Sequence, residues 1–226
     1  MDATAIVLAA GAGRRVGGPE PKAFLKIGGH AILEVAVAAA AASPSVGSVV
    51  VAVPEGFERR ARGLLGGLDE PVTIVTGGPS RQASVRAALK EVPEGVELIA
   101  VHDAARPFAP PDLFTRVLDA VSDGADGAVP VLPMTDTVKR VHDGWVRGTE
   151  PREDLGLAQT PQAFVARALR DAHAQGLAQG FEGTDDAAVM EAAGYRLRAI
   201  PGDPQNVKIT TVLDLAAARE RMGEGA

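Results

Sequence analysis

Short, uninterrupted apolar runs recur along the chain and constrain its fold more than any other feature. Each run is rich in β-branched residues and is followed by a longer segment with helical character. Such runs are typical of parallel strands, because crossover helices cover both faces of a parallel sheet. The runs are Ala5–Leu8, Ser48–Val53, Val72–Val75, Leu98–Val101 and Ala128–Leu132, and the helical segments are the Ala-rich stretch from Ile32, Phe57–Leu65, Arg81–Lys90 and Asp112–Val121. The alternation predicts an α/β fold, with a Rossmann-like, doubly wound, mainly parallel sheet and helices on both faces.

The alternation stops at Pro133, where the sequence becomes polar. Asp143 and Gly144 are a turn signal between two short stretches with strand character. We therefore predict a β-hairpin arm at about residues 134–150, which projects from a single domain formed by residues 1–226. Beyond the arm the sequence predicts helices at Ala163–Ala174, Asp185–Ala193 and Val212–Arg221, the last capped by Thr211, and strands at Arg196–Ile200 and Val207–Ile209.

Composition excludes several functional classes. The chain contains no Cys, which excludes disulfide scaffolds, thiolate zinc sites, iron–sulfur clusters and Cys nucleophiles. The formal net charge of −6 argues against nonspecific binding to nucleic acid. No apolar run reaches the ~20 residues that a membrane-spanning helix needs. We expect a cytoplasmic protein that binds neither nucleic acid nor membrane, and in which local cations bind any anionic ligand.

A glycine-rich loop follows the first predicted strand, over residues 8–18. Glycines there allow backbone N–H groups to approach phosphate oxygens, and Arg15 adds a charged donor. The spacing of Gly11, Gly13 and Gly17 is one residue longer than the dinucleotide fingerprint, and two prolines follow where its helix should run. Nucleotide binding and an ordinary tight turn both remain open for this loop.

Three charged residues lie just past the first loop, after the fourth strand and inside a late predicted strand. Lys22 is either a solvated surface charge or a contact for phosphoryl oxygens. Asp103 follows the fourth strand, where it either caps the next turn or binds Mg²⁺, which needs few carboxylates when phosphates and water supply the other ligands. Lys208 lies in an apolar segment and should face a charge partner. His102 is expected to be structural, because a phosphate nucleophile has no proton for it to remove.

Two further turns allow a structural and a binding interpretation. Gly77 and Ser84 flank a strand-to-helix turn, whose N–H groups and hydroxyl are suited to a base edge or a ribose but equally to a helix cap. Thr184 precedes two aspartates and begins a predicted helix. Its sequence context indicates a helix start as readily as a ligand site.

Taken together and in order, these motifs resemble the 2-C-methyl-D-erythritol 4-phosphate cytidylyltransferases of the non-mevalonate isoprenoid pathway, over nearly the whole chain. Two departures are Val16, where Met is common, and Ala23, where Gln is common; neither removes a charged group. The motifs are Leu8-Ala9-Ala10-Gly11-x-Gly13-x-Arg15, Pro21-Lys22, Gly77-Gly78-x-x-Arg81-x-x-Ser84-Val85, Val101-His102-Asp103-Ala104-Ala105-Arg106-Pro107, Asp136-Thr137-x-Lys139, Thr160-Pro161-Gln162, Thr184-Asp185-Asp186-Ala187 and Asn206-x-Lys208-x-Thr210.

The resemblance implies a reaction and a division of roles. CMP would pass from CTP to the acceptor phosphate by in-line attack on the α-phosphorus, with Mg²⁺ or another divalent cation and with release of pyrophosphate. A homodimer would form through the arm, so that Thr137 and Arg152 act across its interface. The implied sets are Arg15, Lys22 and Lys208 for catalysis, Ala9, Ala10, Gly11, Gly13, Gly77 and Ser84 for the nucleotide, Arg106, Thr137, Arg152, Thr184 and Lys208 for the acceptor, and Asp103 for the metal.

Other functions remain open at this point. A ribitol-5-phosphate cytidylyltransferase shares the fold and much of the motif set, and both acceptors are short polyol phosphates. A sugar-phosphate nucleotidyltransferase that uses another base is a second alternative. From other classes, a nonreactive nucleotide sensor would have little need of Lys22, Asp103 and Lys208 together, and an NADP-dependent reductase would require dinucleotide binding.

Overall fold

An eight-stranded mixed sheet forms the centre of the computed structural model, which describes residues 3–11, 17, 20–68 and 71–223. The strand order is β10-β7-β11-β6-β1-β4-β5, with β12 paired to β7. The chain runs outward from β1 in one direction and then returns to place β6 on its other side, which makes β1 a topological switch point. The strands are β1 (Ala3–Leu8), β4 (Val46–Val53), β5 (Val72–Thr76), β6 (Leu98–Asp103), β7 (Gly127–Pro133), β10 (Gly156–Ala158), β11 (Gln162–Val165) and β12 (Leu197–Pro201).

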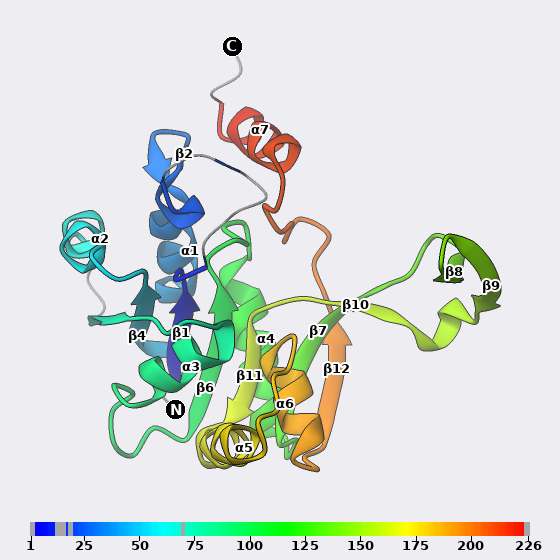
Figure 1. Ribbon diagram of the computed structural model, residues 1–226. Helices are drawn as coiled ribbons and strands as arrows, with labels where there is room; N and C mark the ends of the chain where they lie inside the picture. The colour runs from blue at the N-terminus through cyan, green and yellow to red at the C-terminus, as the bar shows by residue number, and fades with distance from the viewer. Residues whose placement is uncertain (1–2, 12–16, 18–19, 69–70, 224–226) are drawn as a thin grey trace.

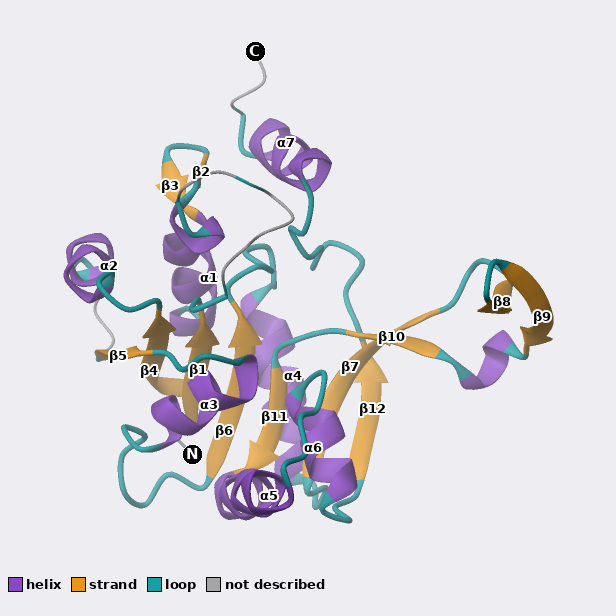
Figure 2. Ribbon diagram, viewed as in Figure 1, coloured by secondary structure: helices purple, strands orange, loops and turns teal. Residues whose placement is uncertain are grey.

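Helices cover both faces of this sheet, as Figures 1 and 2 show. Alternate side chains of β1 point to opposite faces, so that Val7 packs in one core and Ile6 in the other. The first core includes α1 (Ile32–Ala41), α2 (Glu58–Leu65) and α4 (Pro111–Ser122), and the second includes α3 (Arg81–Leu89), α5 (Ala166–Gln179) and α6 (Asp186–Ala192). The predicted doubly wound, mainly parallel sheet is confirmed, because β1, β4, β5 and β6 are parallel neighbours and β12 is parallel to β7.

Two sequence predictions are wrong. The helix expected from Ala163 begins only at Ala166, because β11 occupies the slot between β6 and β7 and pairs antiparallel to both. Phe164 is fully buried there, so sheet pairing overrides the local helical pattern. The strand expected at Val207–Ile209 is irregular backbone. It runs over the end of the sheet and donates from Ile209 N to Ala105 O at 2.8 Å, without a ladder partner among the described residues.

The predicted arm is an antiparallel hairpin of β8 (Val138–His142) and β9 (Trp145–Glu150), which extends away from the sheet in Figure 1. Its turn has positive φ at Asp143 and Gly144, the backbone that a two-residue hairpin loop requires. Trp145 is 70% exposed in this chain, and Val141 and Val146 are exposed beside it. A 3-10 turn, η2 (Arg152–Asp154), leads back toward the sheet.

The remaining elements lie at the opposite end of the sheet from α5. A 3-10 turn, η1 (Lys22–Phe24), and the short pair β2 (Lys26–Ile27) and β3 (His30–Ala31) precede α1, and the sequence pattern predicts neither of these strands. Helix α7 (Val212–Arg221) covers Ile27 and Ile32 through Leu215 and Ala218. In the part of the chain that the structure describes, no helix combines the length and apolarity needed to cross a bilayer.

Helix α7 begins at the predicted cap. Thr211 Oγ1 accepts from Asp214 N at 3.2 Å, and Asp214 Oδ2 accepts from Thr210 Oγ1, Thr210 N and Thr211 N at 2.7 to 2.8 Å. These hydrogen bonds, first of all the one from the Thr210 hydroxyl, lower the pKa of Asp214 from 3.8 to about 2. The cap fixes the direction in which the chain leaves Lys208.

Replacing Asp214 with Asn should lower the free energy of unfolding by about 1 kcal/mol at neutral pH. The pKa of Asp214 is lower in the folded chain than in the unfolded chain. This stabilisation is therefore present above pH 3.8 and is lost as the pH falls through about 2. Urea unfolding should show that the difference in free energy of unfolding between wild type and Asp214→Asn becomes smaller over that pH range. Glu220→Gln, at an exposed position on the same helix, is the control, and a gap that is constant with pH would contradict the cap.

Candidate active site

A pocket of about 390 Å³ opens at the carboxyl ends of β1 and β6 and the start of α3. This is the edge where parallel α/β sheets bind ligands, beside the switch point at β1. Its floor comes from the first loop and the α3 turn, and its charged groups come from distant parts of the chain. The lining residues are Leu8, Ala9, Ala10, Gly11, Lys22, Ala23, Gly78, Pro79, Ser80, Arg81, Ser84, Asp103, Ala104, Ala105, Lys208 and Thr210.

Asp103 lies at the centre of the charge network in this pocket. Its Oδ2 accepts from Lys208 Nζ at 2.7 Å and its Oδ1 from Arg81 Nε at 3.2 Å. Burial alone would raise the pKa of Asp103, but the charges of Arg81 and Lys208 outweigh burial and hold that pKa far below its usual value. Asp103 is therefore ionised at any physiological pH. The charge partner that the sequence predicts for Lys208 is this carboxylate.

The donor set suits a metal ion that arrives with phosphates better than a resident one. Among the described residues, no group of three or more His, Asp or Glu side chains is placed to hold a metal. Oδ1 and Oδ2 of Asp103 each accept a hydrogen bond from one cationic side chain, and each oxygen has a second lone pair. One carboxylate is enough for Mg²⁺ when phosphates and water complete its octahedron. Asp103 thus fits the role of a single protein ligand.

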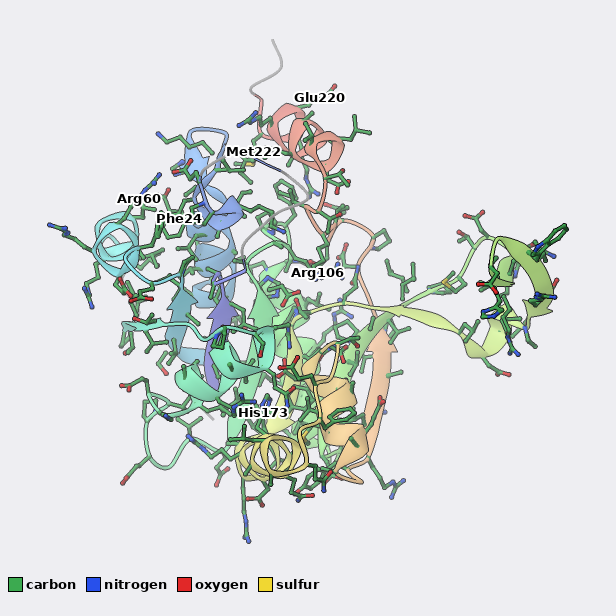
Figure 3. All side chains as sticks on the ribbon, in the orientation of Figure 1. Phe24, Arg60, Arg106, His173, Glu220 and Met222 are labelled. Carbon is green, nitrogen blue, oxygen red and sulfur yellow. The ribbon has the colours of Figure 1, made fainter. Side chains whose placement is uncertain are left out.

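Lys22 contacts the segment that carries Lys208. It begins η1, and its Nζ donates to the carbonyl oxygen of Ile209 at 2.6 Å. Phe24 anchors this turn: it is 1% exposed, its ring packs 4.8 Å from that of Phe57, and the Arg60 guanidinium lies 5.1 Å from its centroid (Figure 3). These contacts fix the turn that carries Lys22, so that two lysines, Lys22 and Lys208, line one pocket.

Buried amides hold the irregular segment that carries Lys208. Asn206 is fully buried and donates from Nδ2 to Thr160 O at 2.8 Å, while Gln159 Nε2 donates to Asp203 O at 2.9 Å. Arg106 donates from Nη1 to Asn206 O at 2.8 Å and from Nη2 to Ala158 O at 3.2 Å. No sequence pattern indicates a role for Gln159 or Asn206. Asn206 begins one motif and Gln159 precedes another, but only the structure shows that the two motifs are in contact.

His102 is fully buried, which agrees with the structural role that we expect for it. Its Nδ1 is 3.1 Å from Thr160 Oγ1 and its Nε2 is 3.1 Å from Arg106 O. Burial lowers the pKa of His102 to about 4, so the ring is neutral at physiological pH. Thr160 Oγ1 also accepts from Asp103 N at 3.0 Å, which fixes the backbone beneath the central carboxylate.

The predicted nucleotide residues that the structure describes meet at the pocket. Ala9, Ala10, Gly11 and Ser84 line it, and Gly77 packs beneath. Ser84 Oγ accepts from Gly78 N at 3.1 Å and donates to Ser80 O at 2.9 Å, so both interpretations of this hydroxyl, a helix-start contact and a ligand contact, are compatible with the structure. Gly13 and Arg15 lie outside the described residues.

Of the predicted acceptor residues, only Lys208 lines the pocket. Arg106 does not line the pocket, and its buried Nε has no hydrogen-bond partner among the described residues. Thr184 is exposed just before α6. Thr137 and Arg152 flank the arm hairpin, where Arg152 Nη1 donates to Thr135 O at 2.6 Å. None of these four residues lines the pocket of the single chain.

Replacing Gly77 with Ala should damage the pocket. An added Cβ would lie 2.3 Å from Ala10 Cβ and 2.9 Å from Ser84 Oγ, so the first loop or the α3 turn must move. We expect CTP affinity, measured by calorimetry, to fall by about tenfold or more, on the order of 1.4 kcal/mol. Gly63→Ala in α2 is the control, since nothing lies within 4 Å of its added Cβ. Unchanged affinity in Gly77→Ala would remove this contact from the nucleotide site.

Comparisons with known proteins agree with one another. The family model for 2-C-methyl-D-erythritol 4-phosphate cytidylyltransferase matches residues 3–224. A protein of that name from Rhodococcus jostii (strain RHA1) is 46% identical over 223 residues, which cover 98% of this chain and 96% of the relative. The crystal structure of the protein of that name from Thermus thermophilus has a TM-score of 0.82 at 35% identity, over 99% of this chain and 100% of that one. The 4-diphosphocytidyl-2C-methyl-D-erythritol synthase from Anaerococcus prevotii DSM 20548 has a TM-score of 0.87 at 27% identity, over 98% of both chains.

Proposed function

The chain belongs to the 2-C-methyl-D-erythritol 4-phosphate cytidylyltransferase family, and from this premise we propose how its residues perform the reaction. The enzyme transfers CMP from CTP to 2-C-methyl-D-erythritol 4-phosphate, which gives 4-diphosphocytidyl-2-C-methyl-D-erythritol and pyrophosphate. The family relationship favours this acceptor over ribitol 5-phosphate. The main support for the proposal is a pocket at the switch point in which Lys208 and Arg81 bind the Asp103 carboxylate and Lys22 lines the same pocket.

The chemical problem is charge rather than proton removal. An oxygen of the acceptor phosphate forms a bond to the α-phosphorus of CTP, and the bond from that phosphorus to the bridging oxygen of pyrophosphate breaks. A phosphate monoester has its second pKa near ~6, so the nucleophile is mostly a dianion at neutral pH and needs no general base. The neutral, buried His102 agrees with this mechanism. The protein must hold two polyanions in line and stabilise the added negative charge.

We assign that stabilisation to Lys22 and Lys208, together with Arg15. Lys22 Nζ and Lys208 Nζ bond to a carbonyl oxygen and a carboxylate, respectively, and both can exchange these partners for phosphate oxygens. Ala9, Ala10, Gly11, Gly13, Gly77 and Ser84 would surround the cytidine. Asp103 would supply one ligand to Mg²⁺ or another divalent cation, which, when bound, neutralises phosphate charge.

The acceptor site is proposed to need two subunits. Arg106, Thr184 and Lys208 would come from one chain of a homodimer, and Thr137 and Arg152 from the arm of its partner. The exposed Trp145, Val141 and Val146 support the arm as a contact surface, since they are unusual on a solvated hairpin. We further propose that residues 1–226 form a single nucleotidyltransferase domain and that it acts in the cytoplasm.

Pyrophosphate release tests the function directly. The enzyme would be incubated with Mg²⁺ and CTP, ATP, GTP or UTP, each with methylerythritol phosphate or ribitol 5-phosphate. Release that requires both CTP and methylerythritol phosphate is expected. Release only with ribitol phosphate would overturn the acceptor, and CTP binding without turnover in any mixture would favour a sensor.

Lys22→Met should lower kcat by about 10²-fold or more, because the lysine charge acts most strongly in the transition state. Steady-state pyrophosphate release measures this loss, and the KM for CTP should change far less than kcat. Lys90→Met, at the exposed C-cap lysine just after α3, is the matched control and should behave as wild type. A raised KM with unchanged kcat would limit Lys22 to ground-state binding.

Subunit complementation tests the shared acceptor site. Arg152→Ala and Lys208→Ala homodimers should each be nearly inactive. After the two are mixed and allowed to exchange subunits, half of the dimers should be mixed, and each mixed dimer has one intact site. Activity should then return to about a quarter of wild type. No recovery, despite exchange shown by native mass spectrometry, would place both residues in one chain's site.

A further inference from the structure

Asp186 is a fully buried carboxylate outside the pocket lining, and the mechanism above gives it no role. Its Oδ1 lies 2.9 Å from His173 Nε2, and its Oδ2 lies 2.7 Å from Arg81 Nη1. His173 is 1% exposed and lies on α5, well away from Arg106 in Figure 3. Burial alone would raise the pKa of Asp186, but the Arg81 charge and the His173 hydrogen bond outweigh it and lower that pKa. Asp186 is thus an ionised group behind the active site.

Stability is a poor explanation for such a pair. Burying two charges costs several kcal/mol per ion before their attraction offsets it, and apolar residues of similar volume often stabilise a fold as well. The location is more informative. Arg81 lies between two buried carboxylates, Asp186 at the start of α6 and Asp103 at the end of β6. Two carboxylates on different elements therefore bind the same guanidinium.

The guanidinium nitrogens of Arg81 differ in their hydrogen bonds to Asp103. Nε and Nη2 form the edge with which arginine binds a carboxylate through two parallel hydrogen bonds. Here Nε donates to Asp103 Oδ1 at 3.2 Å, while Nη2 is buried and has no hydrogen-bond partner among the described residues. Lys208 Nζ, at 2.7 Å, occupies Oδ2 of Asp103, the oxygen that a two-bond pair with Arg81 would use.

We propose that Asp186, supported by His173, is a positioning residue that turns Arg81 away from a two-bond pair with Asp103 and so leaves the second Asp103 oxygen to Lys208. Neither Asp186 nor His173 lines the pocket. Without the Asp186 charge, Arg81 binds both Asp103 oxygens, so Lys208 has to share Oδ2 with a guanidinium nitrogen and its position in the pocket changes. The inference rests on the proposed function, because it concerns the placement of a phosphate-binding lysine.

The first test is Asp186→Asn, which removes the charge and keeps the shape. We expect kcat to fall by about 10-fold to 100-fold with the KM for CTP within about threefold, since displaced groups of this kind cost that much in rate. A crystal structure of the variant should show Arg81 in a two-bond pair with Asp103. Ser43→Ala is the control for loss of a buried polar group: Ser43 is 1% exposed, bonds Thr115 at 3.1 Å and does not line the pocket. It should lower stability and leave kcat unchanged.

A double-mutant cycle separates positioning from a purely structural role. Arg81→Gln removes the group that Asp186 is proposed to restrain. In that background Asp186→Asn should cause no further loss of kcat, and the temperature of unfolding should rise because an unpaired buried charge is removed. If the fold-loss in kcat of the double variant equals the product of the two single losses, the proposal is overturned.

A second pair of variants covers the case in which Asp186→Asn does not fold. His173→Leu removes the hydrogen bond to Asp186 and should lower kcat by about 3-fold to 10-fold, whereas His173→Gln retains an N–H donor and should restore kcat to within about twofold of wild type. Equal losses in both variants would overturn the proposal. A wild-type enzyme that releases no pyrophosphate from any mixture would overturn the proposed function, whereas an active wild type with full kcat in Asp186→Asn would overturn this inference alone.

Discussion

The negative charge of Asp103 holds the candidate active site together. Arg81 comes from the first turn of α3, and Lys208 comes from a segment 105 residues farther along the chain than Asp103. Without a carboxylate between them, these cations would repel each other in a partly buried pocket, where Coulomb interactions are stronger than in water. With it, the positive charges are fixed in place before a ligand arrives. An acidic protein can thereby bind polyanions without a basic surface.

The rest of the fold supplies positions for that carboxylate and its partners. The switch point at β1 places the end of β6 beside the first loop and the α3 turn. Buried amides at Gln159 and Asn206 then secure the irregular segment that brings Lys208 to Asp103, and the α7 cap fixes where that segment ends. Because the segment has no ladder hydrogen bonds in the described part, its position depends on side-chain contacts, which a regular strand would not need.

The sequence predicts the parts of this structure that depend on local pattern. The alternation of strands and helices, the hairpin turn at Asp143-Gly144 and the Thr211 cap all follow from residues close in the chain.

Pairing between distant residues is harder to predict. β11 has the local pattern of a helix and becomes a strand because β6 and β7 leave a slot for it. The apolar pattern around Lys208 predicts a charge partner correctly and a strand wrongly, since the segment finds no neighbouring strand to pair with in the described part of the chain. The Arg81–Asp186 pair joins two helix starts that periodicity cannot relate, so no local signal could identify it.

A crystal structure of the enzyme with Mg²⁺, a non-hydrolysable CTP analogue and the acceptor phosphate is the most direct test of a site organised by Asp103. We predict that Lys208 leaves Asp103 for a phosphate oxygen, that Lys22 exchanges the Ile209 carbonyl for another, and that Arg81 remains between its two carboxylates. Phosphates bound beyond the reach of Lys22, with the Lys208–Asp103 pair intact, would contradict it.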